Sequence, residues 1–579
     1  MFMTKKSMMK RRAVVKGIAA SSLLPLLGMN LMGCSDSSDS GGAQEFDDID
    51  VEFLHGVASG DPLHDRVILW TRVTPQAEGR PRVTWEIAND AAFSEIVASG
   101  SGTTSADVDY TVKIDAADLQ AGSHYYYRFT SGGVVSAVGQ TRTLPAGSVE
   151  TANFAVVSCS NYPAGFFHVY REVANSDVDA VLHLGDYIYE YGVSGYASDR
   201  AEELGRTVQP ENEIISLSDY RTRYAIYRTD VDLQAAHAAH PFFITWDDHE
   251  IANDAWREGA ENHDPASEGE YQARKLAAIQ AWYEWQPVRP PRDEREIIYR
   301  QFRFGDLLDL IMLDTRVIGR DQQFTYTEFA NGGKIDVERA RAAFGAADRT
   351  LLGGSQLDWL RDQLAASNTR WQVLGQQVLM GRYQLPASIL EALDPGLAGP
   401  DAIAEGTAAV FAALEAKNKS SEDRTLEEQA LLDSAVPYNL DAWDGYAAER
   451  DDLLRFARDV DSKLIALAGD THNAWSSQLT TPEGSIAGVE FGCASVSSPG
   501  LEGVLGAENA ALFAPIVATL VDDLKSANLA NRGYLYVALT QDTVEAEQRF
   551  ISGIDSRNYV VEAEKTVSIR VNRGDMVLR

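Results

Sequence analysis

The chain has 579 residues, of which 45% are hydrophobic, and a formal net charge of −34 at pH 7. This hydrophobic content excludes a disordered chain, and the length predicts at least two domains, because one hydrophobic core rarely organises more than about 250–300 residues. Residues 1–33 contain six basic and no acidic residues, so that the rest of the chain carries a net charge of −40. This charge argues against sequence-independent nucleic-acid binding, which requires a basic surface.

The first 45 residues are expected to direct export and anchoring and are excluded from fold reasoning. RRAVVKG (Arg11–Gly17) resembles a twin-arginine motif, and the following LMGC, which ends at Cys34, resembles a lipobox whose cysteine becomes acylated. We therefore predict a signal at 1–33, a lipid on Cys34 and a flexible tether at 34–45. The expected product is an extracytoplasmic, membrane-anchored lipoprotein that has the twin-arginine export machinery as a partner.

A single membrane-spanning anchor is the alternative interpretation of this segment. The weakly apolar run at 18–32 is shorter than the roughly 20 residues that a span needs, which favours the lipoprotein.

Residues 46–148 read as strands throughout. Alternating, aromatic-rich runs of five to seven residues are separated by glycine, proline, aspartate and serine, the pattern of a small β-sandwich. The arrangement resembles a fibronectin type III-like module, with Tyr125–Phe129 as an interior strand and a boundary at Pro145–Ser148. No catalytic constellation is visible in this part of the sequence.

Residues 149–579 alternate strands with helices and predict an α/β-layered catalytic domain. Two amphipathic helices are expected at 270–285 and 355–367, and a charged helical insertion at 396–433 could form a rim or lid over a site. Six apolar runs are buried-strand candidates, namely FAVVSC, AVLHLGD, FFITWDD, DLIMLDT, WQVLGQQ and LIALAGD. The fold class is thus a β-sandwich followed by an α/β sandwich.

Five segments each place metal-ligand residue types just past an apolar, strand-like run: VVSCSN, HLGDYIYEY, ITWDDHEIAND, NLDAWDGY and ALAGDTHNAW. Residues at the carboxyl ends of neighbouring parallel strands meet in one crevice. Carboxylates and an amide suit a hard cation such as calcium, whereas thiolate, phenolate and imidazole suit a transition metal. The segments therefore predict a mixed metal centre.

Each candidate also has an ordinary structural explanation. Asp186 could be a strand-end acid beside core tyrosines, WDDHE an ion-paired helix start, and Asp444 a helix cap. Arg316 in MLDTR could bind phosphate oxygens through its guanidinium group or pair with Asp314. Cys159 could form a disulfide with Cys493, although we favour Cys159 as a ligand and Cys493 as a buried thiol.

Together the motifs resemble the PhoD-type alkaline phosphatases of the calcineurin-like metallophosphoesterase superfamily. The resemblance runs from about residue 50 to 579 and rests on Cys159, GDYIYEY, SDYRTRYAIYR, TWDDHE, EYQARKLAAIQAWYEWQPVR, MLDTR, WDGY and GDTHNAW. It implies hydrolysis of phosphate monoesters and diesters at alkaline pH with iron(III) and calcium, with phosphodiesterase or phospholipase D activity as a side reaction.

The resemblance also implies a role for each matching residue. Asp186 would bridge the metals, His249 would donate a proton to the leaving oxygen or hold the phosphoryl group, and Arg316 would bind phosphate. The iron-side ligands would be Cys159, Tyr189, Asp470 and His472, and the calcium-side ligands would be Asp248, Asn253 and Asp444. Asn253 is open to a one-residue shift along WDDHEIAND.

Two functions of other classes are the alternatives. A non-catalytic calcium-binding surface module would explain the acidic residues but not the cysteine, tyrosine and histidine beside them. An iron-dependent oxidase would favour two histidines and one carboxylate at the metal.

Overall fold

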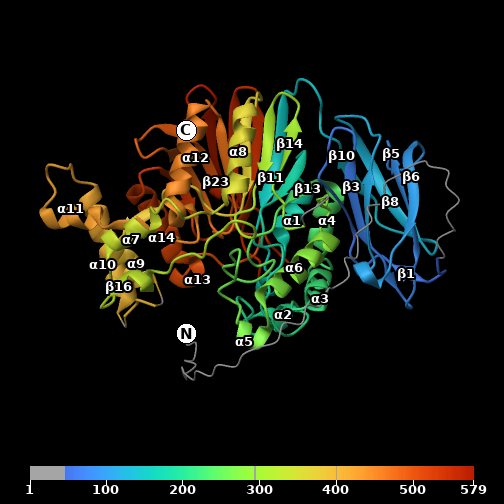
Figure 1. Ribbon diagram of the computed structural model, residues 1–579, viewed down its shortest axis with the longest axis horizontal. Helices are drawn as coiled ribbons and strands as arrows, with labels where there is room; N and C mark the ends of the chain where they lie inside the picture. The colour runs from blue at the N-terminus through green and yellow to red at the C-terminus, as the bar shows by residue number, and fades with distance from the viewer. Residues whose placement is uncertain (1–45, 292–294, 395, 400) are drawn as a thin grey trace.

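The computed structural model describes residues 46–291, 295–394, 396–399 and 401–579. The expected signal (1–33), the lipidated Cys34 and the tether (34–45) lie outside the described residues. Among the helices of the described part, none is long and apolar enough to cross a membrane. The chain forms a small β domain at one end, a large α/β domain in the centre and a group of helices at the other end (Figure 1).

The N-terminal domain is the expected β-sandwich. One sheet has the strand order β10-β8-β5-β6, and the other face is formed by β2, β3 and β7. The strands are β2 Val57–Gly60, β3 Val67–Arg72, β5 Arg82–Ala88, β6 Ile96–Thr103, β7 Thr111–Ala116, β8 His124–Ser131 and β10 Gly139–Arg142. Leu69 of β3, Trp85 of β5 and Tyr127 of β8 are buried in one core between the two faces, as the alternation predicts. Strand β8 is interior, which confirms that prediction.

One sheet of the sandwich is continuous with the large central sheet of the molecule. Strand β2 pairs in parallel with β13 (Pro241–Ile244), so that β2, β3 and β7 extend the large central sheet to nine strands, β27-β26-β25-β11-β12-β13-β2-β3-β7. Gly60 permits this approach, because a Cβ atom there would lie 2.6 Å from the Phe242 carbonyl oxygen. The boundary expected at 145–148 divides the sequence into two parts. In the structure, backbone hydrogen bonds between β2 and β13 join these two parts.

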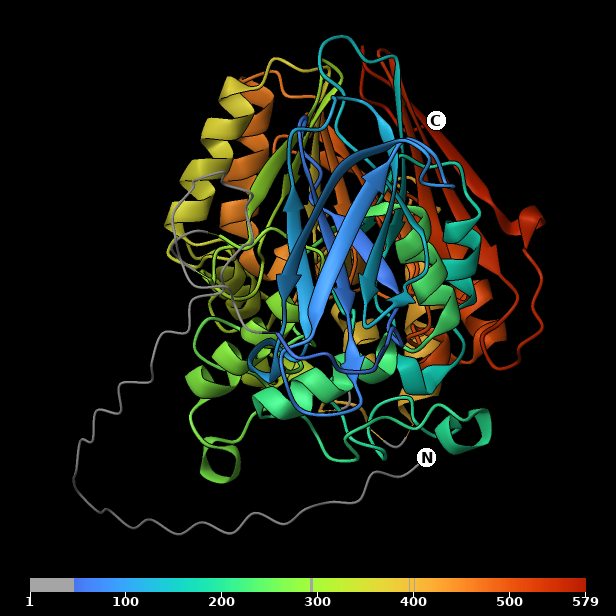
Figure 2. The ribbon, with the colours of Figure 1, turned by 90° about the vertical axis from the view of Figure 1, so that its right-hand side faces the viewer.

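The α/β domain contains two facing sheets covered by helices (Figures 1 and 2). In the first, β11, β12 and β13 are parallel; the second, of seven strands, has the order β14-β15-β18-β21-β23-β22-β24. The strands at the centre of this domain are β11 Thr151–Val157, β12 Ala180–His183, β15 Leu308–Met312, β18 Trp371–Gln376, β21 Leu464–Ala468 and β23 Ile486–Gly492. All six apolar runs singled out in the sequence contribute a strand.

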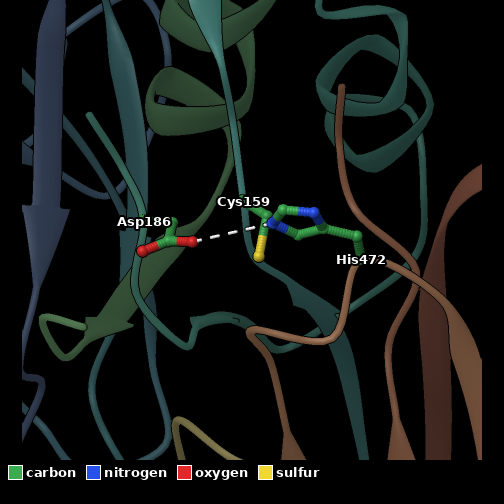
Figure 3. A group of neighbouring side chains, drawn as sticks. All are labelled: Cys159, Asp186 and His472. Atoms are coloured by element: carbon green, nitrogen blue, oxygen red, sulfur yellow. Dashed lines mark ion pairs between the residues drawn. The ribbon is translucent and has the colours of Figure 1, made fainter. Parts of the chain in front are cut away.

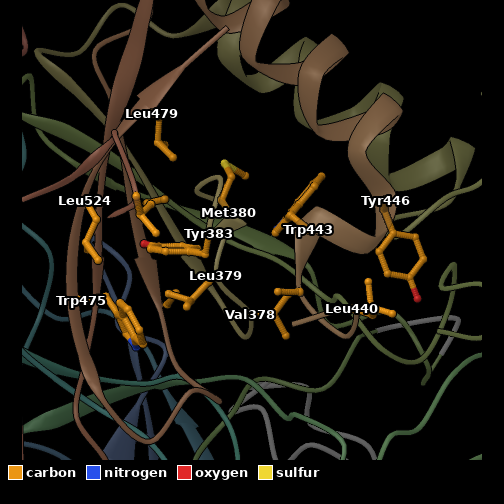
Figure 4. Packing of buried hydrophobic residues seen from close by; sticks show 14 of the residues in the cluster. Val378, Leu379, Met380, Tyr383, Leu440, Trp443, Tyr446, Trp475, Leu479 and Leu524 are labelled. Carbon is orange, nitrogen blue, oxygen red and sulfur yellow. The ribbon is translucent and has the colours of Figure 1, made fainter. Parts of the chain in front are cut away.

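Successive side chains along each strand point to opposite faces of the sheet, and they form three hydrophobic layers. Ile465 and Leu467 of β21 pack between the sheets, whereas Leu464 and Ala466 face the second outer layer. The first outer layer contains α1 (His168–Ala174), α3 (Leu217–Tyr227), α4 (Val231–Ala239) and α6 (Tyr271–Trp285), and the second α8 (Gly354–Ala366) and α12 (Ala447–Asp459). Part of that second layer, including Trp443 and Trp475, is shown in Figure 4. Near-continuous burial of parallel strands is the expected result of helices on outer faces.

The insertion expected at 396–433 is helical, with α10 at Ala402–Lys417 and α11 at Leu426–Asp433. Helix α10 packs against α9 (Ala387–Leu393) and α14 (Ala507–Leu520), at the end of the molecule opposite the N-terminal domain (Figure 1). Among the described residues, the candidate metal-ligand groups include none from this segment.

Candidate metal centre

The central residues of the site lie just past the carboxyl ends of four strands, three in the first sheet and one in the second. Cys159, Asp186, Asp247 and Asp470 lie two or three residues beyond the ends of β11 (Val157), β12 (His183), β13 (Ile244) and β21 (Ala468). The backbone is left-handed at Cys159, Asp186 and Asp470, with φ of 61°, 54° and 59°. Such conformations are costly for residues other than glycine and are typical of functional sites, where the surrounding structure holds them in place.

Glu250 links the loop after β12 to the loop after β13 through hydrogen bonds. Its buried carboxylate accepts hydrogen bonds from the backbone N–H groups of Asp186 (3.0 Å), Tyr187 (2.6 Å) and Asp247 (2.7 Å). Burial, followed by the neighbouring Asp186, raises the pKa of Glu250 to about 8. The loops that carry the ligands are thus held by a side chain that is not itself in a ligand group.

The first ligand group contains Cys159, Asp186 and His472, whose ligand atoms all lie within 4.8 Å of one another (Figure 3). His472 Nε2 is 3.9 Å from Asp186 Oδ2. The Tyr189 hydroxyl donates to the same Asp186 oxygen at 3.0 Å and lies 3.2 Å from His472 Nε2. The structure therefore brings the expected bridging residue, Asp186, together with three of the four expected iron-side ligands.

The loop after β23 orients this group. His472 Nδ1 lies 2.7 Å from the Pro499 carbonyl oxygen, which can only accept, so Nδ1 carries a proton and the neutral ring would have its lone pair on Nε2. Ser498 donates to the Tyr189 hydroxyl at 2.6 Å. Burial, then the Asp186 charge, raises the pKa of both Cys159 and Tyr189 well above their usual ranges. The two cysteines among the described residues, Cys159 and Cys493, are free and buried, so the expected alternative of a disulfide between them is not formed.

Two further groups continue the site. One contains Asp186, Asp248 and His249, and the other Asp247, Asp248 and Asp470. Because Asp186 belongs to the first two groups and Asp248 to the last two, the three form one continuous centre. Asp470, expected beside iron, lies instead in the group with Asp247 and Asp248.

His249 is held by an acid that the sequence did not single out. Its Nδ1 lies 2.7 Å from Oε2 of the fully buried Glu190, and the two rings of Tyr189 and His249 are 4.1 Å apart. Burial opposes the charged form of His249, but the carboxylates of Glu190 and Asp248 raise its pKa well above the usual value.

Arg316 differs from both sequence interpretations. Its guanidinium group is fully buried and donates to Asp247 through Nε, to Asp441 through Nη1 at 2.8 Å, and to Asp470 at 3.4 Å. Asp314 instead accepts from the backbone N–H of Arg316. A guanidinium group that is surrounded by carboxylates and shielded from solvent does not present a free fork to a phosphate, so we assign Arg316 to charge neutralisation.

Two expected calcium ligands are directed away from the centre. Asp444 forms an ion pair with Arg450 and accepts the Tyr383 N–H at 2.7 Å, which occupies both of its oxygens. The side-chain amide of Asn253 donates to Glu261 at 3.3 Å. Each has a neighbour in sequence that faces the site instead.

Those neighbours are Asp441 and Asp254. Asp441 is bound by Arg316 and Arg320, and Asp254 donates its backbone N–H to Asp248 at 2.6 Å. Burial, followed by Asp441 and Asp248, raises the pKa of Asp254 to about 7. The residue that faces the site thus differs from the expected one by three positions in NLDAWDGY, where Asp441 replaces Asp444. It differs by one position in WDDHEIAND, where Asp254 replaces Asn253.

The residues fit bound cations. Asp186 Oδ1 and Asp247 Oδ2 are buried and have no hydrogen-bond partner among the described residues, although buried polar atoms are normally paired. Burial, with added repulsion from other carboxylates, also raises the pKa of Asp247 and Asp470. Cations would stabilise the charged forms of these acids, and the mixture of oxygen, sulfur and imidazole donors suits one hard and one softer metal.

Comparison with known proteins identifies the family of this chain. Residues 154–548 match the family model described as PhoD-like phosphatase, and residues 38–145 match the model for the PhoD-like phosphatase N-terminal domain. Alkaline phosphatase D of Bacillus subtilis (strain 168) is 35% identical over 468 residues, which cover 77% of this chain and 70% of that protein. The solved structure of PhoD superposes with a TM-score of 0.72 at 30% identity and covers 91% of both chains. The chain therefore belongs to the PhoD-like phosphatase family.

Proposed function

We propose that the chain is a metal-dependent alkaline phosphatase that hydrolyses phosphate monoesters and diesters. The observation that carries the proposal is the position of Asp186, which belongs to two ligand groups at once and has one buried oxygen without a hydrogen-bond partner among the described residues. A carboxylate shared by two metals is the arrangement that a two-metal hydrolase requires.

In this proposal, Cys159, Tyr189 and His472 would hold iron(III), and Asp186 would be shared with the second side. Asp470, which belongs to the group with Asp247 and Asp248, would lie on the second side. Calcium would be held on that second side by Asp248, together with Asp254 and with Asp441, whose oxygens Arg316 and Arg320 would have to release when the cation binds. Bound cations would polarise the phosphoryl oxygens and lower the pKa of the attacking water.

The chain's own residues supply the proton transfer. His249, protonated and held by Glu190 through Nδ1 at 2.7 Å, donates a proton to the leaving oxygen. Glu190 also accepts from the Asn253 backbone N–H at 2.8 Å and the Asn262 amide at 2.8 Å, so its carboxylate cannot rotate away. His249 is therefore pre-oriented, which removes part of the entropic cost of the step.

The Asp186→Asn variant tests this proposal. Loss of the bridging charge should lower kcat/KM about 10²–10³-fold, equivalent to several kcal/mol of transition-state stabilisation. Hydrolysis of p-nitrophenyl phosphate and bis-p-nitrophenyl phosphate, iron and calcium content, and thermal unfolding would be measured on the same samples. Asp348→Asn, at an exposed position, is the matched control. Wild-type turnover in Asp186→Asn would refute the assignment.

We further propose that the protein is an extracytoplasmic lipoprotein, exported by the twin-arginine machinery and attached to a membrane through Cys34. The support comes from the Arg11-Arg12 pair and the lipobox-like LMGC segment. Replacing both arginines with lysine should retain the precursor in the cytoplasm, and Cys34→Ala should prevent acylation. Membrane attachment that persists unchanged in Cys34→Ala would contradict the anchor.

A further inference from the structure

Two partly exposed tyrosines form the outer edge of the metal centre. Tyr191 and Tyr196 belong to the loop after β12, and their rings are 6.0 Å apart with an interplanar angle of 54°. Tyr191 lies 5.5 Å from the His249 ring, and Tyr196 lies 6.3 Å from the His472 ring and 24° from parallel to it. We call Tyr191 and Tyr196 the aromatic rim.

The rim lies outside a buried aromatic layer. Tyr189, which is 2% exposed, is within 6.1 Å of Tyr196 and 4.1 Å of His249, measured between ring centres. The buried ring thus belongs to the centre itself, whereas both rim tyrosines retain solvent-accessible surface. Aromatic surface next to a phosphoryl site is available to the organic part of an ester.

The rim is held in place before any substrate arrives. The Tyr196 hydroxyl donates to the Pro499 carbonyl at 2.8 Å, which fixes the direction of its ring. Between the two tyrosines, the chain turns tightly through the hydrogen bond from Gly195 N–H to the Gly192 carbonyl at 2.9 Å. A Cβ atom on Gly195 would lie only 2.4 Å from Tyr191 Cβ, so the turn requires glycine. Preformed rings lose little conformational entropy on binding.

The charges around the rim determine which kind of organic group of a phosphate ester can bind there. The Tyr191 ring lies near the carboxylates of Glu190 and Glu261, neither of which belongs to a candidate ligand group among the described residues. Further negative charge on the organic group would be repelled here, whereas an uncharged planar ring can stack on the tyrosine face.

We propose that Tyr191 and Tyr196 determine substrate specificity by stacking on an uncharged aromatic ring carried by the phosphate ester. This inference rests on the proposed function, since it assumes that the phosphoryl group is bound at the adjacent centre. Aromatic stacking contributes enough to favour aryl over alkyl phosphoryl compounds by about tenfold in affinity.

Phenylphosphonate and methylphosphonate separate ring binding from chemistry, because neither is hydrolysed. Their Kd values would be measured by calorimetry on the metal-loaded protein and on Tyr191→Ala, Tyr191→Phe and Tyr126→Ala. Tyr126, on β8 of the distant sandwich, is a matched, partly exposed control. The wild type, Tyr191→Phe and Tyr126→Ala should prefer phenylphosphonate about tenfold, and Tyr191→Ala should reduce the preference to about threefold or less.

Hydrolysis distinguishes failure of this inference from failure of the proposed function. In Tyr191→Ala, kcat/KM should fall several-fold more for phenyl phosphate than for glycerol 2-phosphate, with unchanged metal content and thermal unfolding. An unchanged phenyl preference, or equal losses for both esters, would overturn the rim. If the wild type hydrolyses neither ester, the proposed function itself fails.

Discussion

Replacing Arg316 with methionine separates charge neutralisation from phosphate binding. The buried guanidinium group forms ion pairs with four carboxylates, those of Asp247, Asp248, Asp441 and Asp470. Methionine keeps much of the side-chain volume but leaves these acids without their cation. Breaking a buried ion pair by removing one partner costs about 3–5 kcal/mol. For cooperative unfolding of a chain of this size the entropy of unfolding is about 1.1 kcal/mol/K, so we expect Tm to fall by about 3–5 °C.

Differential scanning calorimetry with EGTA and then with added calcium would measure this effect. Because the freed carboxylates should bind calcium more tightly, the ion should stabilise Arg316→Met more than the wild type. Arg303→Met, at an exposed arginine, is a suitable control. A phosphate-binding role predicts the opposite pattern, with an unchanged Tm in EGTA and a raised KM. That pattern would refute our assignment of Arg316.

Three further results are expected. Cys159→Ser should shift or bleach a visible charge-transfer band of bound iron(III) and Cys493→Ser should not; equal spectra for the two variants would argue against Cys159 as a ligand. EGTA should inactivate the enzyme and calcium should restore it, with zinc unable to substitute fully, and activity that survives prolonged EGTA would contradict an exchangeable calcium. Burial lowers the pKa of Lys113 from 10.5 to about 7, so the unfolded chain binds more protons between these values. The stability of the wild type relative to Lys113→Met should therefore rise by about 4–5 kcal/mol from pH 7 to 10.5 in denaturant titrations, and a flat difference would contradict the buried ammonium.

The strand-end residues could be found from sequence because two local signals coincide. A buried parallel strand is a near-continuous apolar run, and its carboxyl end is where a ligand side chain meets those of neighbouring strands. Asp186 after AVLHLG and Asp470 after LIALAG carry both signals, and the structure brings them into one centre with Cys159 and His472. Their roles with metals remain predictions.

Other features had no local signal. The parallel pairing of β2 with β13 joins segments about 180 residues apart, and nothing in HGVASGD indicates which strand it will meet. The long antiparallel strands β25 (Arg532–Thr540) and β26 (Thr543–Ile551) mix polar and apolar residues and were not singled out. Glu190 was missed because its importance depends on a contact with His249, 59 positions away.

The two acids of NLDAWDGY show how packing decides between equivalent candidates. The short helix Trp443–Tyr446 buries Asp444 beside Arg450, a residue two turns along the chain whose guanidinium group binds it. Asp441 precedes that helix and faces Arg316 and Arg320. Sequence offers no way to choose, because either acid could have faced the strand ends.

Exchange of each acid for its amide therefore gives opposite expectations. Asp441→Asn should weaken calcium binding at least tenfold by calorimetry and lower activity, because it removes a charged oxygen ligand from the centre. Asp444→Asn should leave calcium affinity unchanged and lower stability by about 3–5 kcal/mol, since Arg450 would keep a buried charge without its partner. If Asp444→Asn abolishes calcium binding while Asp441→Asn does not, the side chains around Trp443–Tyr446 must rearrange when the metal binds, and the assignment from sequence would be the correct one.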